Sequence, residues 1–306
     1  MIKHKIACIV NKIVTRTSWY RNIWGKALDI YNLNTFGLQV INTGSGSGVF
    51  DFNYEGIPVK GFNFAIGPQS LQHDFNIIKN YFSYFDKGCT ILIPLCPFSG
   101  MVVKYGKEHN FKYYPILHPA SIENFDEDER TKAYKLIKQP FQTMPIVCIK
   151  KTLKELLHRV KYRLFKQPIC NSFNFQESAN NFINGWKDQF NIIDISDTIS
   201  SQHKADINNR KKILSDIISF CIARNFRPVV IMPPMHPTLH TQFPSTFVIQ
   251  FVKPLIDEVI SKKITLLDYT RDERFMKDEL YTNALFLNKT GAKAFTKQVL
   301  TDLNLI

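Results

Sequence analysis

Short apolar runs alternate along this chain with longer segments whose apolar residues recur at helical spacing. The short runs predict buried strands, and the longer segments predict amphipathic helices. The predicted strands cover residues 36–41, 59–64, 90–95, 228–232 and 264–267. The predicted helices cover residues 69–84, 206–225, 247–262 and 289–303, and Gly88 is expected to end the first of them. Strands that alternate with helices in this way favour an α/β fold with a parallel sheet and right-handed crossovers.

Two parts of the chain lack this alternation. Residues 1–35 carry apolar residues at loosely helical spacing and predict a basic, helical lead-in. Residues 97–205 combine an aromatic stretch, an acidic cluster, a basic helix at 152–165 and a polar segment at 171–184. We interpret them as an irregular insertion or lid on one α/β domain that spans residues 36–306.

The charge of the chain is strongly unbalanced. Its 306 residues include 39 Lys and Arg against 26 Asp and Glu, which gives a formal net charge of +13. Such an excess suits an anionic partner, such as a membrane surface, a phosphorylated carrier or nucleic acid. The lysines are scattered and no nucleic-acid-binding signature is present, so specific nucleic-acid binding is not expected. The basic helix at 152–165 has two interpretations, a solvated face or a peripheral contact with an anionic membrane.

The cysteines and the hydropathy favour a cytoplasmic location. The six cysteines are Cys8, Cys89, Cys96, Cys148, Cys170 and Cys221. None belongs to a CxxC pair and most lie in apolar runs, a pattern typical of reduced core residues that offers no paired ligands for zinc. No apolar run reaches the ~18 residues of a membrane span. We therefore expect a soluble, cytoplasmic protein with no metal and no cofactor.

The first predicted strand ends in a turn rich in glycine and serine, Gly44-Ser45-Gly46-Ser47-Gly48. Many open α/β enzymes place a nucleophile or a phosphate cradle at such a turn. Glycine permits positive φ and close backbone approach, so main-chain N–H groups can point at an oxyanion. Either serine could direct its hydroxyl into a cleft, or it could hydrogen-bond the backbone of its own turn.

Four segments together resemble the SGNH (GDSL-type) hydrolase superfamily. Residues 42–48 stand where that family has its nucleophile turn, and residues 60–70 resemble the block whose glycine backbone helps to build the oxyanion hole. Residues 231–236 resemble the strand and loop before the last crossover, and residues 281–296 resemble the C-terminal block. The resemblance implies a flavodoxin-like, three-layer α/β/α sandwich. In bacterial branches it also implies esterases or O-acetyltransferases associated with surface polysaccharide.

The three positions of the family's catalytic triad are altered in this chain. The serine position aligns with Gly46, the aspartate position with Asn283 and the histidine position with Phe286. A glycine has no hydroxyl, an amide supplies no negative charge and a phenyl ring accepts no proton. Loss of one triad member typically leaves only ~10³–10⁴-fold residual catalysis. The resemblance therefore implies a protein of surface-glycan biosynthesis or modification that binds a carbohydrate or acyl-bearing small ligand, or serves as a scaffold, without hydrolysis.

An alternative is an active carbohydrate esterase or O-acyltransferase with a rewired site. Ser45 or Ser47 would then be the nucleophile, and His236 or His240 the base. Both histidines follow the carboxyl end of a predicted strand, where open α/β sheets bind ligands, and imidazole is a natural base near neutral pH. A basic nucleic-acid-binding protein is the third, least favoured function.

Other residues complete the expected cleft. The candidate ligand-binding and oxyanion-hole residues are Gly44, Gly46, Gly48, Asn63, Gly67 and Gln69. Asp268 and Asp272 follow the last predicted strand and are expected either to orient a histidine or to cap the next segment. His73 and Asp74, near the start of the helix at 69–84, are expected on the surface.

Overall fold

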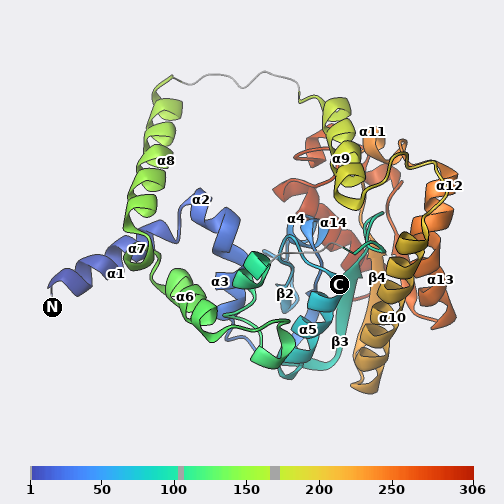
Figure 1. Cartoon of the computed structure of the whole chain (residues 1–306), viewed down its shortest axis with the longest axis horizontal. Coiled ribbons are helices and arrows are strands. Elements are labelled where there is room, and N and C mark those ends of the chain that lie inside the picture. The colour runs from blue at the N-terminus through green and yellow to red at the C-terminus, as the bar shows by residue number, and fades with distance from the viewer. Residues whose placement is uncertain (1, 103–106, 166–172) are drawn as a thin grey trace. The chain divides into compact units, whose positions relative to one another are not determined.

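The computed structural model describes residues 2–102, 107–165 and 173–306 (Figure 1). The chain divides into two compact units, each with an apolar core of its own. Unit 1 is drawn from residues 1–34 and 105–172, and unit 2 from residues 35–104 and 173–306. The segment interpreted as an insertion at 97–205 is thus divided: its central part joins the N-terminal segment in unit 1, and its two ends belong to unit 2.

Unit 2 is built on a five-stranded, all-parallel sheet with the strand order β2-β1-β3-β4-β5. The strands are β1 (Leu38–Asn42), β2 (Gly61–Asn63), β3 (Phe85–Pro94), β4 (Arg227–Met232) and β5 (Thr265–Asp268). This is the flavodoxin-like order, in which the direction of winding reverses between β1 and β3. The predictions of an α/β class, a parallel sheet and a three-layer arrangement are confirmed.

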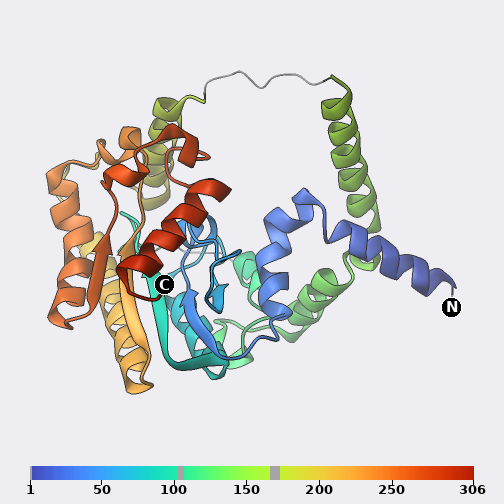
Figure 2. The ribbon, with the colours of Figure 1, turned by 180° about the vertical axis from the view of Figure 1, so that it is seen from behind.

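Helices cover both faces of this sheet. α14 (Lys289–Asp302) packs on one face, where its Phe295 shares a buried cluster with Val40 of β1 and Leu92 of β3. α5 (Leu71–Tyr81), α10 (Ser201–Ala223) and α13 (Lys253–Ser261) pack side by side in a second layer. Figure 1 shows α10 in front of the sheet, and Figure 2, from the opposite side, shows α14 in front of it.

Shorter helical elements connect these layers. The remaining α-helices of unit 2 are α4 (Gly46–Phe50), α9 (Phe175–Phe190), α11 (Pro237–His240) and α12 (Ser245–Phe247). Its 3₁₀ turns are η2 (Phe82–Tyr84), η6 (Glu273–Phe275) and η7 (Asp278–Leu280). α9 covers most of the segment at 171–184 whose composition indicated only a polar stretch, since its buried residues Ala179, Ile183 and Phe190 recur at helical spacing.

Gly88 does not end the helix before it, so that prediction is wrong. α5 ends at Tyr81, continues as the 3₁₀ turn η2, and is followed directly by β3. Gly88 lies inside β3 with a φ of 75°, and its N–H donates to the carbonyl of Asn225 at 3.0 Å. The register between β1 and β3 shifts over the same stretch. The left-handed conformation of Gly88 therefore occurs at an irregularity in the strand and not at the end of a helix.

The helix predicted at 247–262 is interrupted. A π-helical turn, η5 (Val248–Val252), separates α12 from α13. Pro254 lies in the first turn of α13 and has no N–H to continue an α-helical ladder from the preceding turn. The missing donor accounts for the change of helix type at this position.

Unit 1 is helical. Its N-terminal part contains α1 (Ile2–Val14), α2 (Ser18–Tyr20), the π-turn η1 (Arg21–Gly25) and α3 (Lys26–Tyr31). Its second part contains η3 (Lys107–Lys112), η4 (Pro119–Ser121), α6 (Glu127–Lys138), α7 (Pro140–Thr143) and α8 (Pro145–Phe165). Val14, Tyr20 and Cys148 form the centre of its core. Asn11 joins the two parts, because its amide donates to Gln142 Oε1 at 2.6 Å and its Oδ1 accepts the N–H of Phe141 at 2.9 Å.

Two further expectations concern the whole chain. Within the residues that the structure describes, no helix is long and apolar enough to cross a bilayer. Five of the six cysteines have described positions and all five are free thiols, while Cys170 lies outside the described residues.

Candidate functional site

The turn after β1 lies where the winding of the sheet reverses. Gly44 has a φ of 109°, and a Cβ on it would lie 3.3 Å from Pro94 at the end of β3. Ser45 follows, and α4 begins at Gly46, so the predicted glycine turn is a tight turn followed by the first turn of a short helix. Ligands of open α/β sheets bind at such a switch point, which makes this edge of the sheet the candidate site.

The C-terminal block reaches the same place. A Cβ on Gly46 would lie 2.5 Å from Cζ and 2.8 Å from Cε1 of Phe286, distances that real Cβ atoms do not show. The ring of Phe286 also contacts Phe50 of α4, with ring centroids 4.9 Å apart, and Phe182 of α9 at 5.8 Å. Gly46 and Phe286 are therefore in contact, and the aromatic ring fills the space beside the glycine.

Asn283 plays a local part in this arrangement. Its Oδ1 accepts the N–H groups of Leu285 at 3.0 Å and of Phe286 at 2.8 Å. An asparagine whose side-chain oxygen caps its own turn in this way is already hydrogen-bonded within its own segment. The bonds hold the backbone that presents the Phe286 ring to Gly46.

A buried carboxyl joins the two ends of the chain at this site. Asp51, directly after α4, is fully buried, and its Oδ1 accepts the N–H of Leu287 at 3.0 Å. Burial raises the pKa of this carboxyl well above its usual range, against the smaller opposing effects of the Leu287 N–H and the Ser47 hydroxyl. The bond fixes the C-terminal block to α4, and no local sequence pattern singled out this aspartate.

Neither serine of the turn is paired with a histidine. Ser45 Oγ accepts the N–H of Gln69 at 3.2 Å, and Ser47 is buried beside Asp51 in the first turn of α4. In the described part of the chain, no hydrogen bond joins either hydroxyl to an imidazole. A hydroxyl without a base is a poor nucleophile.

Asn63 and Gly48 fasten α4 to the sheet. The amide of Asn63, at the end of β2, donates to the carbonyl of Gly48 at 2.8 Å, and its Oδ1 accepts the amide of Asn42 at 3.0 Å. A Cβ on Gly48 would lie 2.3 Å from the carbonyl oxygen of Thr43. Both candidate residues are thus engaged in holding backbone segments together.

Gln69 and Gly67 complete the second block. The Gln69 side chain is buried, accepts the N–H of Ile66 at 3.1 Å and donates to Asp74. Gly67 lies against the backbone of the turn, since a Cβ on it would be 3.9 Å from the nitrogen of Gly46. Residues 66–69 therefore lie beside the turn after β1.

Asp74 is buried, so its predicted surface position is wrong. Its Oδ1 accepts the N–H of Gly44 at 2.8 Å, which ties the first turn of α5 to the turn after β1. Burial raises the pKa of this carboxyl to about 6, although Gln69, Gly44 and the charge of Arg210 oppose the shift. His73, its neighbour, is half-buried and bonds to the Ser70 hydroxyl.

Arg210 is a second buried charge near the site that sequence reasoning missed. It lies on α10 with 6% of its surface exposed and acts electrostatically on Asp74. Both residues left a signal in the sequence. Asp74 is in phase with the buried Leu71 and Ile78 of α5, and Arg210 is in phase with the buried Ile207 and Leu214 of α10. A charged residue on an apolar stripe indicates a buried charge.

His236 is held on both ring nitrogens. It is buried at the start of α11 and stacked on Phe175 with ring centroids 4.0 Å apart. Its Nδ1 accepts the N–H of Thr238 at 3.3 Å, and its Nε2 lies 3.0 Å from Asp278 Oδ1. This histidine–carboxylate pair is therefore complete without a serine.

His240 lies one turn further along α11. Burial, together with the charges of Arg271 and His236, lowers the pKa of this imidazole. Neither of its ring nitrogens has a hydrogen-bond partner among the described residues. The imidazole of His240 thus lies near His236, but it forms no bond to Ser45 or Ser47.

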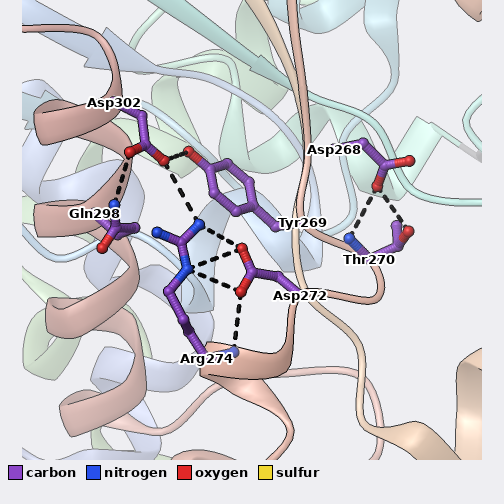
Figure 3. A network of polar contacts seen from close by, with 7 residues as sticks. All are labelled: Asp268, Tyr269, Thr270, Asp272, Arg274, Gln298 and Asp302. Carbon is purple, nitrogen blue, oxygen red and sulfur yellow. Dashed lines mark hydrogen bonds and ion pairs between the residues drawn. The ribbon is translucent and has the colours of Figure 1, made fainter.

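Asp268 and Asp272 cap the segment after β5, the second of their two interpretations (Figure 3). Asp268 Oδ1 accepts the N–H of Thr270 at 2.9 Å. Asp272 accepts the N–H of Arg274 at 3.0 Å and pairs with its guanidinium, which lowers the pKa of the carboxyl. Their hydrogen bonds in the described structure go to this segment and not to a histidine.

In comparisons with known proteins, no family model matches the chain, and no curated protein matches it either.

Proposed function

We propose that this protein is an SGNH-hydrolase-like protein of surface-glycan biosynthesis or modification that has lost hydrolysis. It binds a carbohydrate or an acyl-bearing small ligand, or serves as a scaffold. The observation that carries the proposal is the contact between Gly46 and Phe286. These residues align with the nucleophile and the base of the family, and a phenyl ring now occupies the space that a side chain at residue 46 would need.

The arrangement of the blocks supports the same proposal. The turn after β1 and the C-terminal block are more than two hundred residues apart, and the Asp51–Leu287 bond joins them at one edge of the sheet. The strand order matches the flavodoxin-like sandwich that the resemblance implies. A triad of the family's kind would have to assemble at this edge, and the residues at its three aligned positions, Gly46, Asn283 and Phe286, supply no nucleophile, no carboxylate and no base.

One observation favours the second candidate, an active esterase or O-acyltransferase with a rewired site. His236 is paired with a carboxylate, Asp278, as the base of a triad is. Against this, Nδ1 of His236 is already occupied by Thr238, and Ser45 is bonded to Gln69. The two candidates differ in whether the unaltered protein turns over an acyl ester.

The first experiment measures hydrolysis of p-nitrophenyl acetate and release of acetate from an O-acetylated glycan. The unaltered protein should show no turnover beyond that of a Ser45→Ala/Ser47→Ala/His236→Ala variant, because none of these groups forms a nucleophile–base pair. Turnover that the variant abolishes would overturn the proposal in favour of the rewired enzyme.

The second experiment restores the three altered positions together. Gly46→Ser/Asn283→Asp/Phe286→His should gain ester hydrolysis and react with a fluorophosphonate probe at residue 46, since the ring is removed as the three groups are supplied. Gly46→Ser/Asn283→Asp is the matched control, and it should gain neither property because Phe286 stays in place. Equal labelling of both variants would show that the ring does not block the position.

A further inference from the structure

The outward face of α8 in unit 1 is apolar. Exposed apolar residues recur along it at i, i+3, i+4 and i+7 spacings, and they are Ile146, Ile149, Leu153, Leu156, Leu157 and Val160. At 3.6 residues per turn these side chains lie within an arc of roughly 100°. Their exposed fractions run from 48% to 79%. We call this set the α8 stripe; Figure 1 shows α8 projecting from the other helices of its unit.

The opposite side of α8 packs into unit 1. Cys148 is buried in the core, and Glu155 accepts the N–H groups of Ser18 at 2.9 Å and of Trp19 at 3.2 Å. An amphipathic helix of a globular protein normally turns its apolar side inward. Here the inward side includes a glutamate and a threonine, and the apolar side faces outward. The rotation of α8 is therefore fixed by the Glu155 contacts, and the stripe is left largely exposed.

α1 repeats this pattern next to α8. Ile6, Ile9 and Ile13 share one face and are 53%, 59% and 50% exposed. Ile9 and Ile13 line an apolar groove of about 390 Å³ together with Leu156 of α8. Lys12, Arg16 and Arg159 line the same groove, and so does Glu155, whose carboxylate pairs with Arg159. The two apolar faces thus meet at a groove with basic residues around it.

The charge of these two helices is almost entirely positive. α1 contains three lysines and no acidic residue, and α8 contains six basic residues and one acidic residue, Glu155. Lys150, Lys154 and Lys161 are exposed and border the α8 stripe on one side of the helix. Helices with an apolar stripe flanked by lysines bind the interface of anionic bilayers, since the stripe enters the acyl boundary and the lysines contact the headgroups.

We propose that α1 and α8 form a peripheral docking surface for an anionic membrane. The combination of apolar and positively charged residues favours an anionic membrane over other partners. A nucleic acid would contact the lysines and leave the isoleucines and leucines in water. A neutral bilayer would contact only the apolar residues. Unit 1 would bring the sheet unit to the membrane surface. The docking needs no contribution from the site in unit 2.

Vesicle co-sedimentation tests the proposal. The full chain is mixed with vesicles of phosphatidylcholine containing about one third phosphatidylglycerol, and with phosphatidylcholine vesicles alone. The stripe variant is Leu153→Gln/Leu157→Gln/Val160→Gln, and the lysine variant is Lys150→Gln/Lys154→Gln/Lys161→Gln. The matched controls in unit 2 change exposed residues of the same kinds, and they are Ile193→Gln/Ile249→Gln/Ile260→Gln and Lys262→Gln/Lys277→Gln/Lys297→Gln.

The unaltered protein should bind the anionic vesicles, and bind phosphatidylcholine far more weakly. The lysine variant should bind on the order of 100-fold more weakly, since each lysine near an anionic surface contributes about fivefold. The stripe variant should lose at least about tenfold. Both controls should bind like the unaltered protein, and far-ultraviolet circular dichroism checks that the variants keep their helices.

Two kinds of result would overturn the proposal. One comes from the vesicles alone: either equal affinity for the two kinds of vesicle or no vesicle binding at all. The other is binding of an oligonucleotide that the lysine variant loses and the stripe variant keeps, with no loss of vesicle binding in either, since that pattern assigns the lysines to nucleic acid.

Discussion

Gly46 and Phe286 are coupled through a single steric contact. The space beside the glycine is taken by the far edge of the ring, and the ring contacts Phe50 and Phe182. A side chain at residue 46 that moves the Phe286 ring therefore changes these two contacts as well. A side chain at residue 46 therefore costs free energy through its neighbours as well as through its own contact.

Gly46→Ala should lower the free energy of unfolding by about 1–3 kcal/mol, because the added methyl group overpacks the ring. In a Phe286→Ala background the same change should cost less, with a coupling of about 0.5–3 kcal/mol. Urea denaturation of the four proteins measures this cycle. Gly185→Ala is the control. Gly185 lies on the exposed side of α9, its added Cβ would have no atom within 4 Å outside its own stretch of helix, and the change should stabilise the protein by about 0.5–1 kcal/mol. Strictly additive losses would contradict the contact.

At the scale of elements, α5 is attached to β1 through a side chain. Asp74 in the first turn of α5 accepts the N–H of Gly44, and Gln69 before the helix donates to the same carboxyl. The turn after β1 is thus fixed by a group whose burial opposes its ionisation. This attachment is sensitive to pH.

The pH dependence has a defined sign. A carboxyl whose pKa rises from 3.8 to about 6 on folding binds more protons in the folded state, so it reduces stability as the pH rises through this window. Asp74→Asn keeps the acceptor oxygen and removes the ionisation. The variant should therefore gain roughly 3 kcal/mol relative to the unaltered protein between pH 4 and pH 7. Urea denaturation across this range measures the difference, and a constant difference would contradict the burial of the carboxyl.

The sheet and its main helices were predictable because each is dominated by one local pattern. The second half of β3 and most of β4 are apolar runs, and α10 and α14 carry apolar residues at helical spacing, so the apolar pattern alone identifies them. The position of Gly88 was not predictable, because a glycine with positive φ suits a helix cap and a strand irregularity equally well. The helix α9 was missed because Asn and Gln dilute its three buried residues.

The site was predictable only in part. The resemblance placed the two blocks that contain Gly46 and Phe286, which the structure brings into contact. Asp51 and Arg210 depend on contacts between elements far apart in the sequence, and such contacts are not encoded in any short segment. Phase along the helix would have marked Asp74 and Arg210 as buried, although it would not have identified their partners.

At the scale of the whole molecule, the chain forms two units, and its three tryptophans can report on each unit separately. Trp19 and Trp24 belong to unit 1, and Trp186 belongs to unit 2. Unit 1 is assembled from two separate stretches of chain that Asn11 joins through Gln142 and Phe141. Each unit has a separate core, so each can respond to a local change by itself.

Asn11→Ala removes both bonds of this side chain and leaves the Phe141 N–H without its acceptor, a cost of about 1–3 kcal/mol. In a Trp186→Phe background the tryptophan fluorescence should show a lower denaturation midpoint after the change. In a Trp19→Phe/Trp24→Phe background, where Trp186 reports on unit 2, the midpoint should stay the same. Equal shifts in both backgrounds would mean that the two units unfold together.

If the proposed loss of hydrolysis is right, the ring beside Gly46 also imposes an order on any return to catalysis. A hydroxyl gained at residue 46 while Phe286 is still present meets a steric penalty and finds no base, so that first step brings only cost. The route is open only if the ring is replaced first, at the expense of its packing with Phe50 and Phe182. On the proposed function, reversal through single substitutions thus begins with a loss of stability, and hydrolysis would be regained slowly by chance mutation.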